Sequence, residues 1–79
     1  MPRLRPVSLK DLEVLLFGLG FVFSRQSASH RIYWKDGLTR PLVVPCHGKK
    51  MIQVDTLIGL LKTAHISREE FLSLLGDID

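Results

Sequence analysis

The chain has 79 residues, of which 46% are hydrophobic and 24% charged, and its formal net charge is +3. This composition is typical of one small globular domain and argues against a disordered chain. No apolar run approaches the roughly 20 residues of a membrane-spanning helix, and the opening MPRLRPVS lacks the apolar core of a signal peptide, so we expect a cytoplasmic protein.

The charges are unevenly distributed along the chain. Between residues 25 and 50 a single acid, Asp36, faces six cations, and acids gather toward the C-terminus. The six cations are Arg25, Arg31, Lys35, Arg40, Lys49 and Lys50. A basic middle region suits an anionic partner, although a solvated face that only keeps the protein soluble is an equal alternative.

The first predicted element is a helix that begins after Ser8. Asp11 stands three residues beyond Ser8, as in a variant of the capping box, and Gly20 supplies the left-handed residue that often ends a helix. Between them, four leucines recur at helical spacing and form one apolar stripe.

Three strands are predicted next. Residues 21–26 begin with aromatic and β-branched side chains, the turn 27–29 follows, and residues 30–35 form the second strand. Asp36-Gly37 predicts a type I′ hairpin into a third strand over 38–44.

The third strand and the two remaining helices complete the order. Pro41 cannot donate to a sheet, so the third strand should lie at an edge or carry a bulge there. A second helix should open near Val54 with Asp55 as its N-cap and stop near His65, and the capping box at 67–70 should start a short last helix.

This order predicts an α+β fold in which two helices cover one face of a three-stranded antiparallel sheet and the other face stays open. Along the second strand, Arg31, Tyr33 and Lys35 alternate with His30, Ile32 and Trp34. Because Ile32 should enter the core, the first three are expected on the open face. There they could pair with phosphates and stack a base, or they could form an ordinary sheet surface.

A metal site is not expected. The candidate ligands His30, Cys46, His47 and His65 include no closely spaced pair except the adjacent Cys46-His47, whose side chains diverge. The single cysteine cannot form an internal disulfide, and the sequence has neither a glycine-rich phosphate loop nor a nucleophile elbow.

His30 is the side chain best suited to proton transfer near neutral pH, with cations close by. RNA carries its own nucleophile, the 2′-hydroxyl, so one histidine on a basic surface can suffice for cleavage. From residue types alone, catalysis is the minority alternative, because a lone histidine is more often structural.

The chain resembles the HicA family of toxin ribonucleases, the mRNA interferases of type II toxin–antitoxin systems, over almost its whole length. The resemblance is carried by PRLRPVSLKDLEVLLFGLGFVFSRQ, SHRIY, VVPCHGKK, the Thr56-Leu57 helix start and ISREEFL. It implies a single domain over residues 1–79, with a fold like that of double-stranded RNA-binding domains.

The resemblance also implies a function and a site. The histidine after the turn between the first two strands is catalytic in the family and matches His30; members cut mRNA and are inhibited by a HicB-type antitoxin. Ala28 and Asp55 stand where the family commonly has glycine. If position 28 needs a positive φ, alanine costs roughly 1 to 2 kcal/mol there.

Further RNA contacts are expected around His30. Lys49 and Lys50 precede a helix N-terminus, Arg25 flanks the turn, and Ser29 could orient the histidine. Arg31, Tyr33 and Lys35 join them as the strand contacts described above. The role of His47 stays open among RNA contact, helix cap and antitoxin contact, and a structural or loop-ordering role is favoured over direct catalysis.

Two functions therefore follow from the sequence. The first is a metal-independent endoribonuclease with His30 as general acid or base, no cofactor, and growth arrest as its cellular result. The alternative is a non-catalytic RNA-binding module that uses the same sheet and basic surface; a domain that recognises only protein is a third possibility.

Overall fold

The computed structural model describes residues 4–46 and 51–78 of the chain. In chain order, its elements are β1 (Val7–Ser8), α1 (Leu9–Gly18), β2 (Val22–Ser27), β3 (His30–Trp34), β4 (Leu42–Pro45), β5 (Met51–Ile52), α2 (Val54–Ala64) and α3 (Arg68–Ile78). The predicted α+β fold with a three-stranded antiparallel sheet is confirmed, and the strand order is β2-β3-β4.

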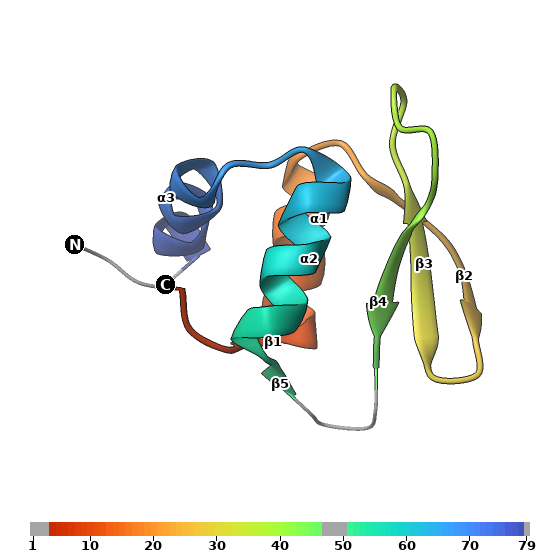
Figure 1. Ribbon diagram of the computed structural model, residues 1–79, viewed down its shortest axis with the longest axis horizontal. Helices are drawn as coiled ribbons and strands as arrows, with labels where there is room; N and C mark the ends of the chain where they lie inside the picture. Colours follow the sequence, from red (N-terminus) through yellow and green to blue (C-terminus); the bar gives the residue numbers. More distant parts are fainter. Residues whose placement is uncertain (1–3, 47–50, 79) are drawn as a thin grey trace.

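The elements form layers, as Figure 1 shows. Helices α1 and α2 lie against one face of the sheet, and α3 packs on the side of these helices away from the sheet. In the described part of the chain, no helix covers the other sheet face. None of the helices in these residue ranges is long and apolar enough to cross a membrane.

Helix α1 has the predicted caps. The Ser8 hydroxyl accepts a hydrogen bond from the Asp11 backbone N–H at 3.1 Å, and Gly20 has a φ of +97° just beyond the helix end. The leucine stripe faces the core, with Leu12, Leu15 and Leu16 all buried. The local signals for this helix were therefore sufficient.

The connection between β3 and β4 differs from the prediction. Strand β3 ends at Trp34 and β4 begins only at Leu42, so the two-residue hairpin is wrong. A type I′ turn needs positive φ at both central residues, but of Asp36 and Gly37 only the glycine has it, at +94°. Pro41 lies just before β4 rather than inside it.

Helix α2 begins at Val54 as predicted, but its N-cap is Gln53 and not Asp55. Asp55 lies in the first turn, where its carboxylate still interacts favourably with the helix dipole. Just before this helix, β5 pairs with β1 through Val7 and Ile52. Two-residue strands carry no readable alternation, so this small sheet was not predicted.

The last helix is capped as predicted, because the Ser67 hydroxyl accepts from the Glu70 N–H at 3.0 Å. The preceding helix ends at His65, which has a left-handed φ of 58°. Helix α3 contains 11 residues, as many as α2.

Candidate nucleic-acid interface

The cross-strand register decides which side chains of β3 face the helices. Tyr33 pairs with Phe23 on β2 and with Leu42 on β4, and Arg31 pairs with Val44. Tyr33 and Val44 are 0% exposed and Leu42 is 1% exposed, so this set points into the core beneath the helices. Residues directly opposite one another in a sheet share a face.

The open face therefore carries His30, Ile32 and Trp34, the reverse of the prediction. The expectation that Arg31, Tyr33 and Lys35 lie on the open face is wrong, and a fully buried Tyr33 ring cannot stack on a base. Ile32 is also buried, so both faces of β3 read as apolar in sequence.

A carboxylate on α1 explains why Tyr33 can be buried. The Tyr33 hydroxyl donates to Glu13 Oε2 at 2.7 Å. The rings of Phe17 and Phe23 meet the Tyr33 ring edge-on, with centroids 6.2 and 5.8 Å away. A buried tyrosine needs a partner for its hydroxyl, and Glu13 provides it.

Arg31 is held by the same carboxylate. Its Nη2 lies 2.6 Å from Glu13 Oε2, its Nε donates to the Tyr33 hydroxyl at 3.0 Å, and its Nη1 donates to Gln26 Oε1 at 3.0 Å. The guanidinium carbon also lies 4.4 Å from the Phe23 ring centroid. Through these contacts Arg31 links α1 to the β2-β3 hairpin, and its charge does not lie on the open face.

The ionisation of this network is set by its hydrogen bonds. The bond from Tyr33, helped by Arg31, holds the pKa of the Glu13 carboxyl below its ordinary value. Burial, and then the Glu13 carboxylate, raise the pKa of Tyr33 to about 12. At neutral pH, Glu13 and Arg31 are thus charged and Tyr33 is neutral.

Lys35 is also turned away from the open face. Its Nζ lies 5.5 Å from the Phe21 ring centroid, over a buried ring at the end of α1. The side chain is half-buried, and its ammonium group covers apolar surface instead of lying beside His30.

The turn before His30 is tied to the rest of the sheet. Ala28 has a positive φ of 54°, and Ser29 does not, which matches a type II′ turn between the paired residues Ser27 and His30. The half-buried Ser29 accepts through its carbonyl from the Cys46 N–H at 2.6 Å. His30 thus starts a strand whose backbone is fixed on both sides.

His30 itself is exposed at this end of the open face. Arg25 pairs with Ile32 while His30 pairs with Ser27, so Arg25 is a diagonal neighbour of His30 on the same face. Such neighbours are about 7 to 8 Å apart. The structure thus brings together His30, Arg25 and the Ser29 turn among the predicted site residues.

The other predicted contacts cannot be placed. His47, Lys49 and Lys50 lie outside the described residues. Within the described ranges, no three histidine, cysteine, aspartate or glutamate side chains group closely enough to hold a metal ion.

Sequence reasoning missed Trp34 as a surface residue. It is 37% exposed on the open face, opposite the exposed Val22 of β2. A tryptophan directly followed by Lys-Asp-Gly, at the end of a strand, was the available signal, because side chains near a strand end are less often covered.

Comparison with known protein families gives a match. A family model described as the HicA toxin of bacterial toxin–antitoxin systems matches residues 9–66. No curated protein and no solved structure matches the chain.

The positive φ of Ala28 predicts a stabilising substitution. Ala28→Gly should raise the free energy of unfolding by about 1 kcal/mol, because glycine adopts this φ without the clash of a Cβ. His65→Gly is the matched control, since His65 is exposed with a nearly equal φ of 58°. Chemical denaturation measures both. If His65→Gly raises the free energy of unfolding but Ala28→Gly lowers it, the Ala28 methyl group stabilises the fold by more than the positive φ costs, and the prediction is contradicted.

The raised pKa of Tyr33 predicts a loss of stability at high pH. The unfolded chain ionises Tyr33 near pH 10 but the folded chain only near pH 12, so ionisation between these values favours unfolding. The loss should reach about 2 to 3 kcal/mol by pH 12. Tyr33→Phe should lack this part of the loss, whereas lysines ionise in both proteins. Because Tyr33 is the only tyrosine in the chain, its tyrosinate absorbance reports the folded pKa directly, and a value near 10 would contradict the burial argument.

Proposed function

Because the chain belongs to the HicA toxin family and is therefore the toxin of a toxin–antitoxin system, we propose that it is a metal-independent endoribonuclease that cleaves mRNA. His30 is the catalytic general acid or base, and a HicB-type antitoxin covers the site. Growth arrest through mRNA loss in the cytoplasm is the expected cellular result.

The observation that carries this proposal is the placement of His30. Its side chain is exposed on an open sheet face, while the backbone before it is fixed by the bond from Cys46 to the Ser29 carbonyl. An exposed imidazole on a rigid support can approach a phosphodiester without a rearrangement of the fold.

The chemistry uses the 2′-hydroxyl of the RNA. His30 takes the hydroxyl proton as the 2′-oxygen attacks the adjacent phosphorus, and the bond from phosphorus to the 5′-oxygen of the next nucleotide breaks. A proton from solvent or from a protonated His30 neutralises the leaving oxygen. The products are a 2′,3′-cyclic phosphate and a free 5′-hydroxyl, and no metal or redox partner takes part.

Arg25 is the proposed phosphate contact. It is exposed beside His30 on the same face, where its guanidinium can offset the negative charge that develops on the phosphoryl oxygens. Lys49 and Lys50 remain proposed phosphate contacts and His47 a proposed RNA contact, from the sequence pattern alone. Arg31 is assigned a positioning role instead, because Glu13, Gln26 and Tyr33 engage its donors.

The second candidate is an RNA-binding module without catalysis. The same exposed face and Arg25 would support it, since neither requires proton transfer. The two candidates make different predictions for the pure protein in EDTA. Only the endoribonuclease cuts RNA, and only in the endoribonuclease does the rate of cleavage depend on His30.

His30→Ala should lower the rate of RNA cleavage by about 10² to 10⁴, the usual contribution of one acid–base group, and leave the thermal unfolding midpoint close to that of the parent. The measurement is cleavage of end-labelled RNA by purified protein in EDTA. His65→Ala is the matched control, because His65 is exposed at the far end of α2, and it should cut at the parental rate.

Two results would contradict the proposal. A folded His30→Ala protein that cuts at the parental rate excludes His30 as the catalytic group. Parental protein that binds RNA with steep salt dependence but produces no fragments identifies the binding module instead.

A further inference from the structure

The open face continues from His30 along β3 to Trp34, and we propose that Trp34 and the hollow beside it bind an unpaired nucleobase of the RNA. This inference rests on the proposed function, because the base belongs to the same RNA strand that passes His30. It assigns a binding subsite to residues outside the site predicted from the sequence.

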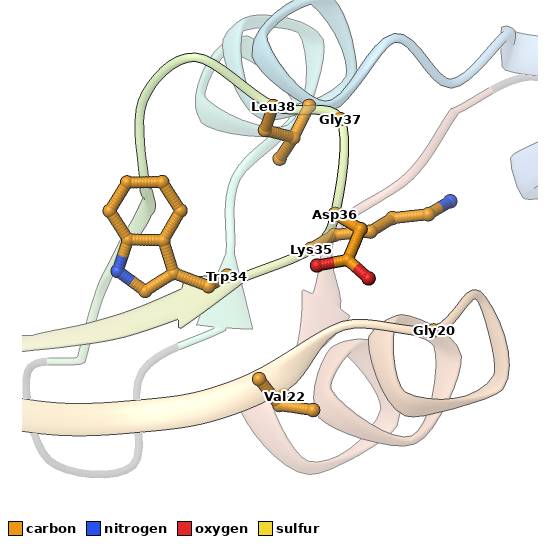
Figure 2. Close-up of a pocket in the computed structure, with 7 residues that line it drawn as sticks. All are labelled: Gly20, Val22, Trp34, Lys35, Asp36, Gly37 and Leu38. Atoms are coloured by element: carbon orange, nitrogen blue, oxygen red, sulfur yellow. The ribbon is translucent and has the colours of Figure 1, made fainter.

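The hollow has a size suited to a base. Its volume is about 620 Å³, and its walls are Gly20, Val22, Trp34 and residues 35–38. Figure 2 shows the indole on one side of this space, with Val22 below it and Leu38 above. Small-molecule sites commonly measure about 300 to 1,000 Å³, and this one is open toward solvent, so a nucleobase can enter without displacing the fold.

Trp34 offers an exposed aromatic side chain. Its side chain is 37% exposed, and the residue paired with it, Val22, is 61% exposed. Every base has a π-face, and stacking of bases on aromatic side chains is the usual means by which proteins hold single strands. An exposed indole flanked by a small apolar side chain leaves room for such a stack.

The charges favour a base over a phosphate in the hollow. The Asp36 carboxylate belongs to its lining and repels phosphate, but it can accept hydrogen bonds from the N–H groups on base edges. Lys35 also lines the hollow, with its ammonium group 5.5 Å from the Phe21 ring centroid, so the lining carries one charge of each sign and does not favour a phosphate. The phosphate-binding cation on this face is Arg25, close to His30.

The spacing connects the hollow with the catalytic residue. His30 and Trp34 lie four residues apart on β3 and share a face, which places them about 13 Å apart at the usual rise of a strand. Between them, Ile32 is only 8% exposed, and Val43 lies across from it on β4. An extended RNA strand can therefore lie along the apolar surface of Ile32 and Val43, with a phosphate at His30 and a base at Trp34.

A protein segment is the other occupant that an apolar patch could accept. The charge of the chain, +3 overall and concentrated between residues 25 and 50, favours the polyanion. RNA is therefore the proposed occupant, and binding by protein alone is an outcome that the experiment can reveal.

The single tryptophan makes a direct experiment possible. Trp34 is the only tryptophan in the chain, so its fluorescence reports this position alone. Titration with a mixed-sequence 2′-O-methyl oligoribonucleotide, which lacks the attacking hydroxyl and is not cut, should quench the emission. Binding of the same oligonucleotide, followed by polarisation of a label on the RNA, should be about 5- to 150-fold weaker for Trp34→Ala, the fold-change that corresponds to loss of one base stack.

Two variants serve as controls. Trp34→Phe keeps an aromatic face and should retain most of the affinity. Val14→Ala removes a comparably exposed apolar side chain from α1, away from the open sheet face, and should bind as the parent does. Thermal unfolding of each variant checks that a loss of affinity is not a loss of fold.

The outcomes separate this subsite from the proposed function. Equal affinity for parent and Trp34→Ala without quenching overturns the subsite, even when His30→Ala has lost cleavage. Quenching and weaker binding by Trp34→Ala support the subsite, even if the parent cuts no RNA and the endoribonuclease proposal fails. A change in tryptophan emission on addition of the antitoxin but not of RNA overturns the proposal and assigns this surface to a protein contact.

Discussion

The orientation of the sheet depends on one carboxylate. Glu13 on α1 accepts through a single oxygen from the Tyr33 hydroxyl at 2.7 Å and from the Arg31 guanidinium at 2.6 Å. With this partner, the polar tip of Tyr33 is satisfied and the ring can be fully buried. Because side chains of a strand alternate, burial of Tyr33 places His30, Ile32 and Trp34 on the opposite face.

This choice of face determines which residues are available for function. Arg31 supports the hairpin from within, through Glu13 and Gln26, and Gln26 in turn reaches the turn with a long bond of 3.4 Å to the Ala28 carbonyl. The network thus runs from a core helix to the residues just before His30. A proton-transfer group gains from such support, because its rate depends on a fixed approach to the substrate.

The parts of the fold that the sequence predicted well are those set by local contacts. The Ser8 and Ser67 caps and the glycine end of α1 each involve residues within a few positions of one another. The wrong predictions concern features that local sequence signals do not decide. The β3–β4 connection is a longer loop despite its Asp-Gly pair, and the N-cap of α2 is Gln53, directly after the strand β5 that pairs with β1, rather than Asp55.

In the candidate site, too, local features followed from the sequence and long-range features from the tertiary structure. The sequence alone determined two local features, the position of His30 after a short turn and the nearby Arg25, whereas the positive φ at Ala28 was only a condition until the structure showed it. Tertiary structure decided which face each side chain occupies, since Ile32 and Tyr33 are adjacent and both apolar enough to be buried. Alternation shows that they lie on opposite faces but not which face the helices cover. Burial of Leu42 and Val44 on the Tyr33 side, together with Glu13, a partner 20 residues from Tyr33 in the chain, fits Tyr33 into the covered face and leaves Trp34 as the aromatic side chain open to a ligand.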